Sequence, residues 1–160
     1  MTWRSTSPTQ SVMKGSDVAT VTSLGVVTTG EIWLKVPQTI FMRWMGRLVD
    51  GVSAKDMMLS MIGRFGMNGG SYQAVEFCGE AVTALPMAER MTLSNMSAEM
   101  GAQAGLIAAD ATTLAHLKSI GVSEGQLSGA EQWFTDEDAE YEQHMFDASR
   151  LSPQVAAPHS

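Results

Sequence analysis

The sequence predicts an α/β domain, because short apolar segments typical of strands alternate with segments whose apolar residues recur at helical spacing. The chain has 160 residues, of which 44% are hydrophobic and 17% are charged. The length has room for one domain and a short piece of another, and the apolar content is enough for a sizeable core, which excludes an intrinsically disordered chain. Glycine and proline separate the segments, as they do at connections between strands and helices.

Charge and hydropathy exclude several classes of protein. Ten basic residues stand against seventeen acidic ones, so the net charge is -7. A nucleic-acid binder that relies on a basic surface is therefore excluded, since phosphates would be repelled. The sequence has no apolar run long enough to span a membrane and no apolar core of a signal peptide near its start, so we expect a cytoplasmic protein.

The first third of the sequence predicts a start without regular structure, then a helix and a strand. Residues 1–15 are rich in serine and threonine and are expected to be disordered. A helix or a helix–turn is expected between Asp17 and Leu34, ended by Pro37. The mixture of β-branched and aromatic residues over Thr39–Leu48 predicts a strand.

The clearest helix follows that strand. Ser53 and Asp56 have the spacing of a capping box, with aspartate in place of glutamate, and Gly66 ends the pattern. Asn68-Gly69-Gly70 then predicts a turn. The apolar residues that recur on one face of this helix are Met57, Met58, Met61, Ile62 and Phe65.

Further elements are expected in the middle of the chain. A second strand is predicted over Tyr72–Cys78, and Pro86 marks the start of a helix that runs to about Ala104 and is closed by Gly105. Leu106–Ala109 has the composition of a short buried strand.

The last part of the sequence predicts one more helix and one more strand. Asp110 is expected to cap a helix, Val122–Ala130 to form a loop, and Tyr141–Ala148 to form the last strand. Leu114, Leu117 and Ile120 are predicted to face the core from that helix. The thirteen methionines fall on apolar faces, which indicates core filling.

Helix geometry singles out two polar residues, Asn95 and Glu99. They lie one turn apart, with Ala98 and Ala102 beside them. A carboxylate that points into a cleft can accept or donate a proton, whereas the same pair on a solvated face would have no function. The spacing alone leaves both interpretations open. The residues expected to face the core from the opposite side are Leu93, Met96, Met100 and Ala104.

Other reactive residues do not form a recognised site. His116, His144 and His159 lack the spacing of metal ligands, and Cys78 is expected to be an inert core thiol. A single cysteine excludes a disulfide framework and any multi-cysteine metal site built by this chain alone. The phosphate-binding loop and the nucleophile elbow are both missing from the sequence.

Five segments, taken in order, resemble the large subunit of the aconitase family, particularly 3-isopropylmalate dehydratase and homoaconitase. The segments are GEIWLKVPQTI (residues 30–40), GRLVDGVSAKDMMLSMIGRFGMNGG (46–70), AVEFCGEAV (74–82), MAERMTLSNMSAEMGAQAGLIAAD (87–110) and LSPQVAAPHS (151–160).

The resemblance implies a more detailed fold. It suggests a three-layer α/β/α-type subdomain with a small mixed sheet and flanking helices. Residues 16–35 would be the end of a first subdomain, and residues 36–160 would form the second, smaller α/β subdomain.

The resemblance also implies a chemistry. Enzymes of this family are hydro-lyases that move water across a C–C double bond in a hydroxy di- or tricarboxylic acid. They use a [4Fe–4S] cluster held by three cysteines, whose free iron acts as a Lewis acid. The family's N-M-x-x-E segment reaches this site, which implies a place near the cluster for Asn95 and a catalytic role around the bound substrate or water for Glu99.

Two departures from the family pattern indicate that this chain does not form the whole active site. The family's D-S-H-T motif has no match here, and one cysteine cannot hold the cluster, so no metal ligand is expected in this chain. We expect a partial large subunit that forms one wall of an active site and is inactive alone. Its partners would be the remainder of a large subunit, a small subunit, or both. The alternatives are a non-catalytic, decayed or repurposed α/β binding module, and an independent acid–base enzyme that uses Glu99.

Overall fold

The computed structural model describes residues 27–31, 36–130, 135 and 141–157. The chain divides into two compact units, Met1–Val36 and Pro37–Ser160. Of the helix predicted over Asp17–Leu34, only a short helical segment at residues 27–29 lies among the described residues. The disordered start predicted for residues 1–15 lies outside them, and the predicted boundaries at residues 15 and 35 stay predictions.

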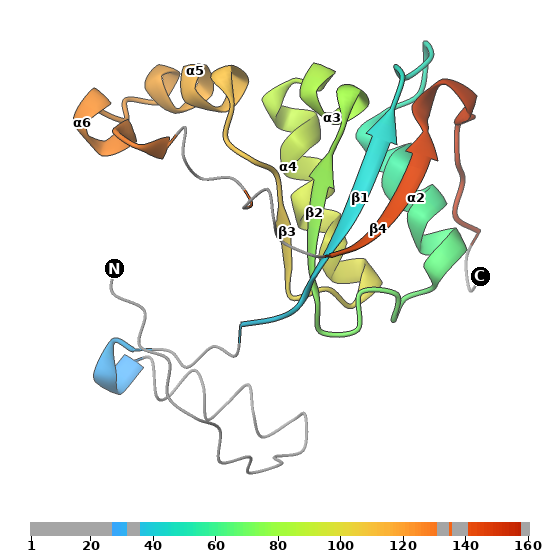
Figure 1. The fold of residues 1–160 in the computed structure, drawn as a ribbon, viewed down its shortest axis with the longest axis horizontal. Helices are drawn as coiled ribbons and strands as arrows, with labels where there is room; N and C mark the ends of the chain where they lie inside the picture. Colours follow the sequence, from blue (N-terminus) through green and yellow to red (C-terminus); the bar gives the residue numbers. More distant parts are fainter. Residues whose placement is uncertain (1–26, 32–35, 131–134, 136–140, 158–160) are drawn as a thin grey trace. The chain divides into compact units, whose positions relative to one another are not determined.

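The second unit is built on a four-stranded sheet with the strand order β3-β2-β1-β4 (Figure 1). The strands are β1 (Thr39–Met45), β2 (Ala74–Cys78), β3 (Ala104–Leu106) and β4 (Glu142–Asp147). All three ladders are parallel, so the α/β class is confirmed, while the sheet is parallel rather than mixed. Parallel neighbours need long crossover connections, and the helices between the strands provide them.

The helices are α2 (Ala54–Phe65), α3 (Glu80–Ala84), α4 (Met87–Met96), α5 (Ala111–Ser119) and α6 (Glu124–Leu127). Two 3-10 helices, η1 (Ser97–Met100) and η3 (Ala148–Arg150), follow α4 and β4. Helices α2 and α4 lie together on one face of the sheet (Figure 1). Among the described helices, none combines the length and apolar character of a membrane span.

The core fills the space between that face of the sheet and the helices. Alternate residues of β1 are buried, and β2 contributes Val75 and Phe77 at the matching register positions. The ring of Trp44 stacks on Phe146 with the centroids 4.5 Å apart. The prediction that methionines fill the core is confirmed for Met42, Met57, Met58, Met61, Met96 and Met100. It is wrong for Met67, Met91 and Met145, whose side chains are exposed.

The opposite face of the sheet is less covered in the described part of the chain. Met145 of β4 is 62% exposed there, and the ring of Phe41 meets the edge of Tyr141. The hydroxyl of Thr135 donates to the Glu76 carboxylate at 2.5 Å, so Thr135 lies at this face. The described helices thus cover one face, where the resemblance implies a layer on each side.

The ends of α2 follow the predicted signals. The Asp56 carboxylate accepts hydrogen bonds from the backbone N–H and the hydroxyl of Ser53, both at 2.8 Å. At the other end, Gly66 has a φ of 77°, which favours glycine, and its N–H donates to the Ile62 carbonyl. The predicted helix from Ser53 to Gly66 is therefore confirmed.

Acid is expected to destabilise the fold through Asp56. Its pKa is lowered below the ordinary value of 3.8, chiefly by the hydrogen bond from the Gln154 backbone N–H. A carboxyl whose pKa is lower in the folded state stabilises the fold above pH 3.8, and this stabilisation is lost as the pH falls through the folded pKa. In urea titrations from pH 7 to pH 2, Asp56→Asn should show a shallower loss of stability than the unaltered chain. An equally steep loss in both proteins would contradict the assignment.

The end of α4 differs from the prediction. The helix does not run to Ala104, because it tightens into η1 after Met96 and then ends at Gly101, which has a φ of 76°. Gly105 does not close the helix but lies within β3. The predicted strand Leu106–Ala109 is displaced to Ala104–Leu106, and its position at the edge of the sheet leaves Leu106 47% exposed.

The region of α5 and α6 corrects two predictions. Asp110 caps α5 as predicted, since it accepts from the Thr113 N–H at 3.1 Å, but no residue of α5 is buried. Leu114 and Leu117 are only half-buried and Ile120 is 63% exposed, because α5 lies beyond the β3 edge of the sheet (Figure 1). The segment Val122–Ala130 is not all loop, because it contains α6.

A buried ion pair ties α4 to α5. The Arg90 guanidinium is 2% exposed and contacts both carboxylate oxygens of Asp110, at 2.6 and 2.8 Å. It also donates to the carbonyls of Thr83, in α3, and of Leu85, which follows α3. One side chain therefore holds three parts of the fold together.

Candidate functional site

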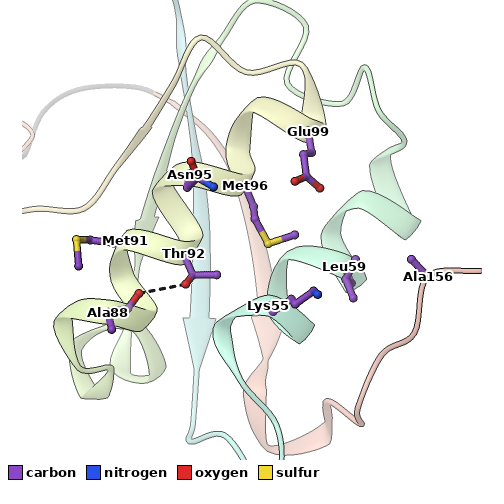
Figure 2. Close-up of a pocket in the computed structure, with 9 residues that line it drawn as sticks. All are labelled: Lys55, Leu59, Ala88, Met91, Thr92, Asn95, Met96, Glu99 and Ala156. Carbon is purple, nitrogen blue, oxygen red and sulfur yellow. Dashed lines mark hydrogen bonds between the residues drawn. The ribbon is translucent and has the colours of Figure 1, made fainter.

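A hollow of about 620 Å³ lies on the outer surface of α2 and α4 (Figure 2). It is open to solvent along the groove between the two helices, and the segment after η3 reaches it at Ala156. Nine residues line the hollow: Lys55, Leu59, Ala88, Met91, Thr92, Asn95, Met96, Glu99 and Ala156.

Asn95, in α4, and Glu99, in η1, line this hollow because the opposite sides of α4 and η1 are used by the core. Leu93 and Met100 are fully buried, which turns Asn95 and Glu99 outward, where both are exposed. The structure therefore brings the two predicted site residues to one surface. Of their predicted small neighbours, Ala98 is exposed beside them, whereas Ala102 lies after the end of the helix and packs against the core.

The polar groups of the two residues are available to a ligand. Neither the Asn95 amide nor the Glu99 carboxylate has a hydrogen bond to any residue that the structure describes. The hydroxyl of Thr92, in contrast, donates to the Ala88 carbonyl at 3.1 Å. The exposed ammonium of Lys55, from α2, is the cation among the residues that line the hollow.

The hollow also contains residues that the sequence analysis did not single out. Lys55 and Leu59 are four residues apart on α2, and this spacing could have placed them on one helical face. Ala156 lies in the family-like segment 151–160, but nothing in that segment indicated a place at the hollow. It is brought to the hollow because Leu151 is buried and the Gln154 N–H donates to the Asp56 carboxylate at 2.7 Å.

The histidines are not brought together. His116 lies on α5, and His144 lies on β4 with its Nε2 3.1 Å from a carboxylate oxygen of Glu142. His159 lies outside the described residues. The described part of the chain contains no group of three histidine, cysteine, aspartate or glutamate side chains that could hold a metal ion.

Cys78 is half-buried rather than a core residue. In β2 the core positions are taken by Val75 and Phe77, so alternation turns Cys78 to the other face of the sheet. Burial raises the pKa of its thiol, Arg43 opposes the rise and Glu76 adds to it. The thiolate, which is the form that binds metals, is therefore disfavoured at neutral pH.

A family model for the aconitase family (aconitate hydratase) matches residues 13–160. The chain belongs to the aconitase family. The resemblance carried by the five sequence segments is thus confirmed, and this aconitase-family chain has the parallel α/β unit described above.

Three relatives illustrate the match. The chain is 42% identical over 135 residues to "3-isopropylmalate dehydratase large subunit 1" of Archaeoglobus fulgidus, and 44% identical over 136 residues to the "3-isopropylmalate dehydratase large subunit" of Nitratidesulfovibrio vulgaris. It is 42% identical over 135 residues to "Probable methanogen homoaconitase large subunit" of Methanosarcina mazei. Each match covers 84% of this chain but only 31%, 31% and 33% of the relative. The chain thus spans about a third of the length of these relatives.

The residues present do not fit a [4Fe–4S] cluster. Three thiolates are needed, and the chain has one cysteine. That cysteine lies on the sheet face away from the core, has a raised pKa and is not among the residues lining the hollow. Any cluster at this surface would have to be held by other parts of an enzyme.

Proposed function

We propose that this chain forms one wall of the active site of an aconitase-type hydro-lyase, an enzyme that adds or removes water in a hydroxy di- or tricarboxylic acid. The observation that carries the proposal is the unpaired carboxylate and amide of Glu99 and Asn95 at one hollow. Groups so placed can bind a ligand without first breaking a hydrogen bond within the described chain. The proposal places this activity in the cytoplasm.

Glu99 is the proposed catalytic residue. Adding water to a C–C double bond requires that a proton leave the water or hydroxyl group, and a carboxylate within hydrogen-bond reach can accept it. The same carboxyl group, once protonated, returns the proton when water is removed. Its exposed position within the hollow leaves room for a substrate to approach.

Asn95 is proposed to bind and orient. Its amide NH₂ can donate to a carboxylate oxygen and its amide oxygen can accept from a hydroxyl, so Asn95 can bind either group of a hydroxy acid, or a neighbouring cofactor. It lies in α4, whose inner face is fixed by the buried Leu93, so the amide is presented from a rigid element.

The other parts of the site are proposed to come from partners. The relatives are named as large subunits, which suggests a second subunit, and this chain covers only about a third of them. The cluster ligands and the groups that clamp the substrate's carboxylates would come from the remaining part of a large subunit, with or without a small subunit. The chain alone would then be inactive.

Complementation tests this function. The chain is co-expressed with the missing segments of a related large subunit and with its small subunit, under anaerobic conditions with iron and sulfide. Hydration of an unsaturated dicarboxylic acid is then followed by the loss of its ultraviolet absorption. With Glu99→Gln, we expect kcat to fall at least about a hundredfold, since a general base contributes about 10²–10⁴-fold to the rate.

Glu124→Gln is the matched control, because it removes the same charge from an exposed glutamate on α6, away from the hollow. Its activity should equal that of the unaltered chain. Full activity in Glu99→Gln would contradict the catalytic role of Glu99. Binding of a complementing segment without any turnover would instead support the alternative of a non-catalytic binding module.

A further inference from the structure

The direction of the Glu99 side chain depends on a change of helix type. Helix α4 is regular as far as Met96, and the chain then continues as the 3-10 helix η1. Asn95 lies before the change, whereas Glu99 lies after it. Successive residues are about 100° apart in an α-helix and about 120° apart in a 3-10 helix. Over three residues, Glu99 is therefore rotated by about 60° relative to Asn95, compared with an uninterrupted α-helix.

This rotation has a visible result. Figure 2 shows the Glu99 carboxylate over the space between η1 and α2, whereas Asn95 lies on the flank of α4 farther from α2. In an uninterrupted α-helix, residues four apart are stacked on one side. The change of helix type thus separates the two groups and turns the carboxylate toward the hollow.

Ser97 is placed to cause the change. Its side chain is fully buried, and Ser97 and Arg90 are the two buried polar or charged residues among those described. The Ser97 hydroxyl donates to the Ser94 carbonyl, three residues earlier, at 2.5 Å. A serine that bonds back to a carbonyl of the preceding turn competes with the regular helix pattern and bends the helix.

Two close approaches hold Ser97 and η1 in place. The backbone of β3 passes so near that a Cβ on Gly105 would collide with the Ser97 hydroxyl and come within 2.8 Å of the Ser94 carbonyl oxygen. At the end of η1, the carbonyl of Met100 accepts a hydrogen bond from the Gly70 N–H at 2.7 Å. The segment that carries Glu99 is therefore held at its start by the packing of β3 on Ser97 and at its end by the hydrogen bond to Met100.

We propose that Ser97 is a positioning residue for Glu99: its hydrogen bond to the Ser94 carbonyl maintains the 3-10 turn that turns the Glu99 carboxylate toward the hollow. The part of the proposal that concerns catalysis rests on the proposed function. The part that concerns the turn does not.

The test is Ser97→Ala in the full chain, read by NMR. A 3-10 turn brings the Ser97 Hα close to the Glu99 amide, and an α-helix instead brings the Asn95 Hα close to it. We expect the first contact to be lost and the second to appear in Ser97→Ala. Ser119→Ala is the matched control, because the Ser119 hydroxyl also donates to a carbonyl three residues earlier, that of His116, at 2.7 Å. If Ser97→Ala does not fold, Ser97→Cys is used instead, because cysteine has a similar shape and a weaker hydrogen-bond donor. In Ser97→Cys we expect to see both the contact from the residue 97 Hα and the contact from the Asn95 Hα to the Glu99 amide.

Retention of the 3-10 contacts in Ser97→Ala would overturn the proposal. In the complemented enzyme, kcat should fall about tenfold to a hundredfold while KM changes less than about twofold, as for a misplaced reacting group. Loss of the turn with an unchanged kcat would overturn the positioning role. If the unaltered chain gives no activity on complementation, the proposed function fails, and the NMR result alone still decides whether Ser97 sets the turn.

Discussion

Replacing Gly79 by alanine is expected to lower the free energy of unfolding by about 3 kcal/mol or more, the sum of backbone strain and overpacking. Gly79 joins β2 to α3 with a φ of 102°, a conformation that residues with a side chain rarely adopt. A Cβ there would also collide with the carbonyl oxygen of Trp44 in the neighbouring strand. Because that atom belongs to the backbone of the buried β1, it cannot move aside. Urea unfolding of both proteins measures the difference.

Gly63→Ala is the control for this substitution. Gly63 lies in the interior of α2, and a Cβ there would have no neighbour within 4 Å. Alanine is the better helix former, so stability should rise by up to about 1 kcal/mol. A loss smaller than about 0.5 kcal/mol in Gly79→Ala, within the range of ordinary surface changes, would contradict the junction described between β2 and α3.

Asp110→Ala is expected to cost about 3–5 kcal/mol, because it leaves the Arg90 guanidinium buried without its counter-charge. Arg90 is 2% exposed, whereas the Asp110 side chain is 34% exposed. The substitution also removes the cap of α5, where Asp110 accepts from the Thr113 N–H. Thermal and urea unfolding of the full chain check this result.

The reverse substitution should cost less. In Arg90→Met the apolar part of the side chain is retained, no buried charge remains, and Asp110 can turn to solvent. The carbonyls of Thr83 and Leu85 lose their donor, so we expect the free energy of unfolding to fall by about 2 kcal/mol. Glu124→Ala, which breaks the exposed Lys118–Glu124 pair, should change stability by less than about 1 kcal/mol. Equal losses of stability in Asp110→Ala and Arg90→Met would contradict the conclusion that the cost comes from a buried Arg90 charge beside a partly exposed Asp110.

The elements with complete local signals could be predicted from the sequence. Helix α2 has a capping pair at Ser53 and Asp56, one apolar face and a terminal glycine, and each signal acts within a few residues. The cap at Asp110 is equally local. Periodicity also placed Asn95 and Glu99 on the outer side of their helix, because that prediction needed only the position of the buried residues.

The errors arose where distant contacts decide the structure. Two glycines follow Glu99 within six residues, and the fold uses Gly101 to end the helix, whereas Gly105 lets β3 pass close to Ser94 and Ser97. Leu114, Leu117 and Ile120 have the spacing of a buried face, but α5 lies beyond the sheet and has no buried residue. The 3-10 turn was also missed, because nothing in the sequence shows that Ser97 would be buried beneath the backbone of β3.

The position of β4 has a consequence for synthesis of the chain. Strand β1 pairs with β4, and the partner of Ile40 is Glu142, about 100 residues later. A ribosome that adds about 5–20 residues per second needs about 5–20 s to supply that partner. Throughout this interval, one edge of β1 presents unpaired backbone groups beside a largely formed apolar core. Until β4 emerges, the nascent chain is therefore exposed to self-association through this edge of β1.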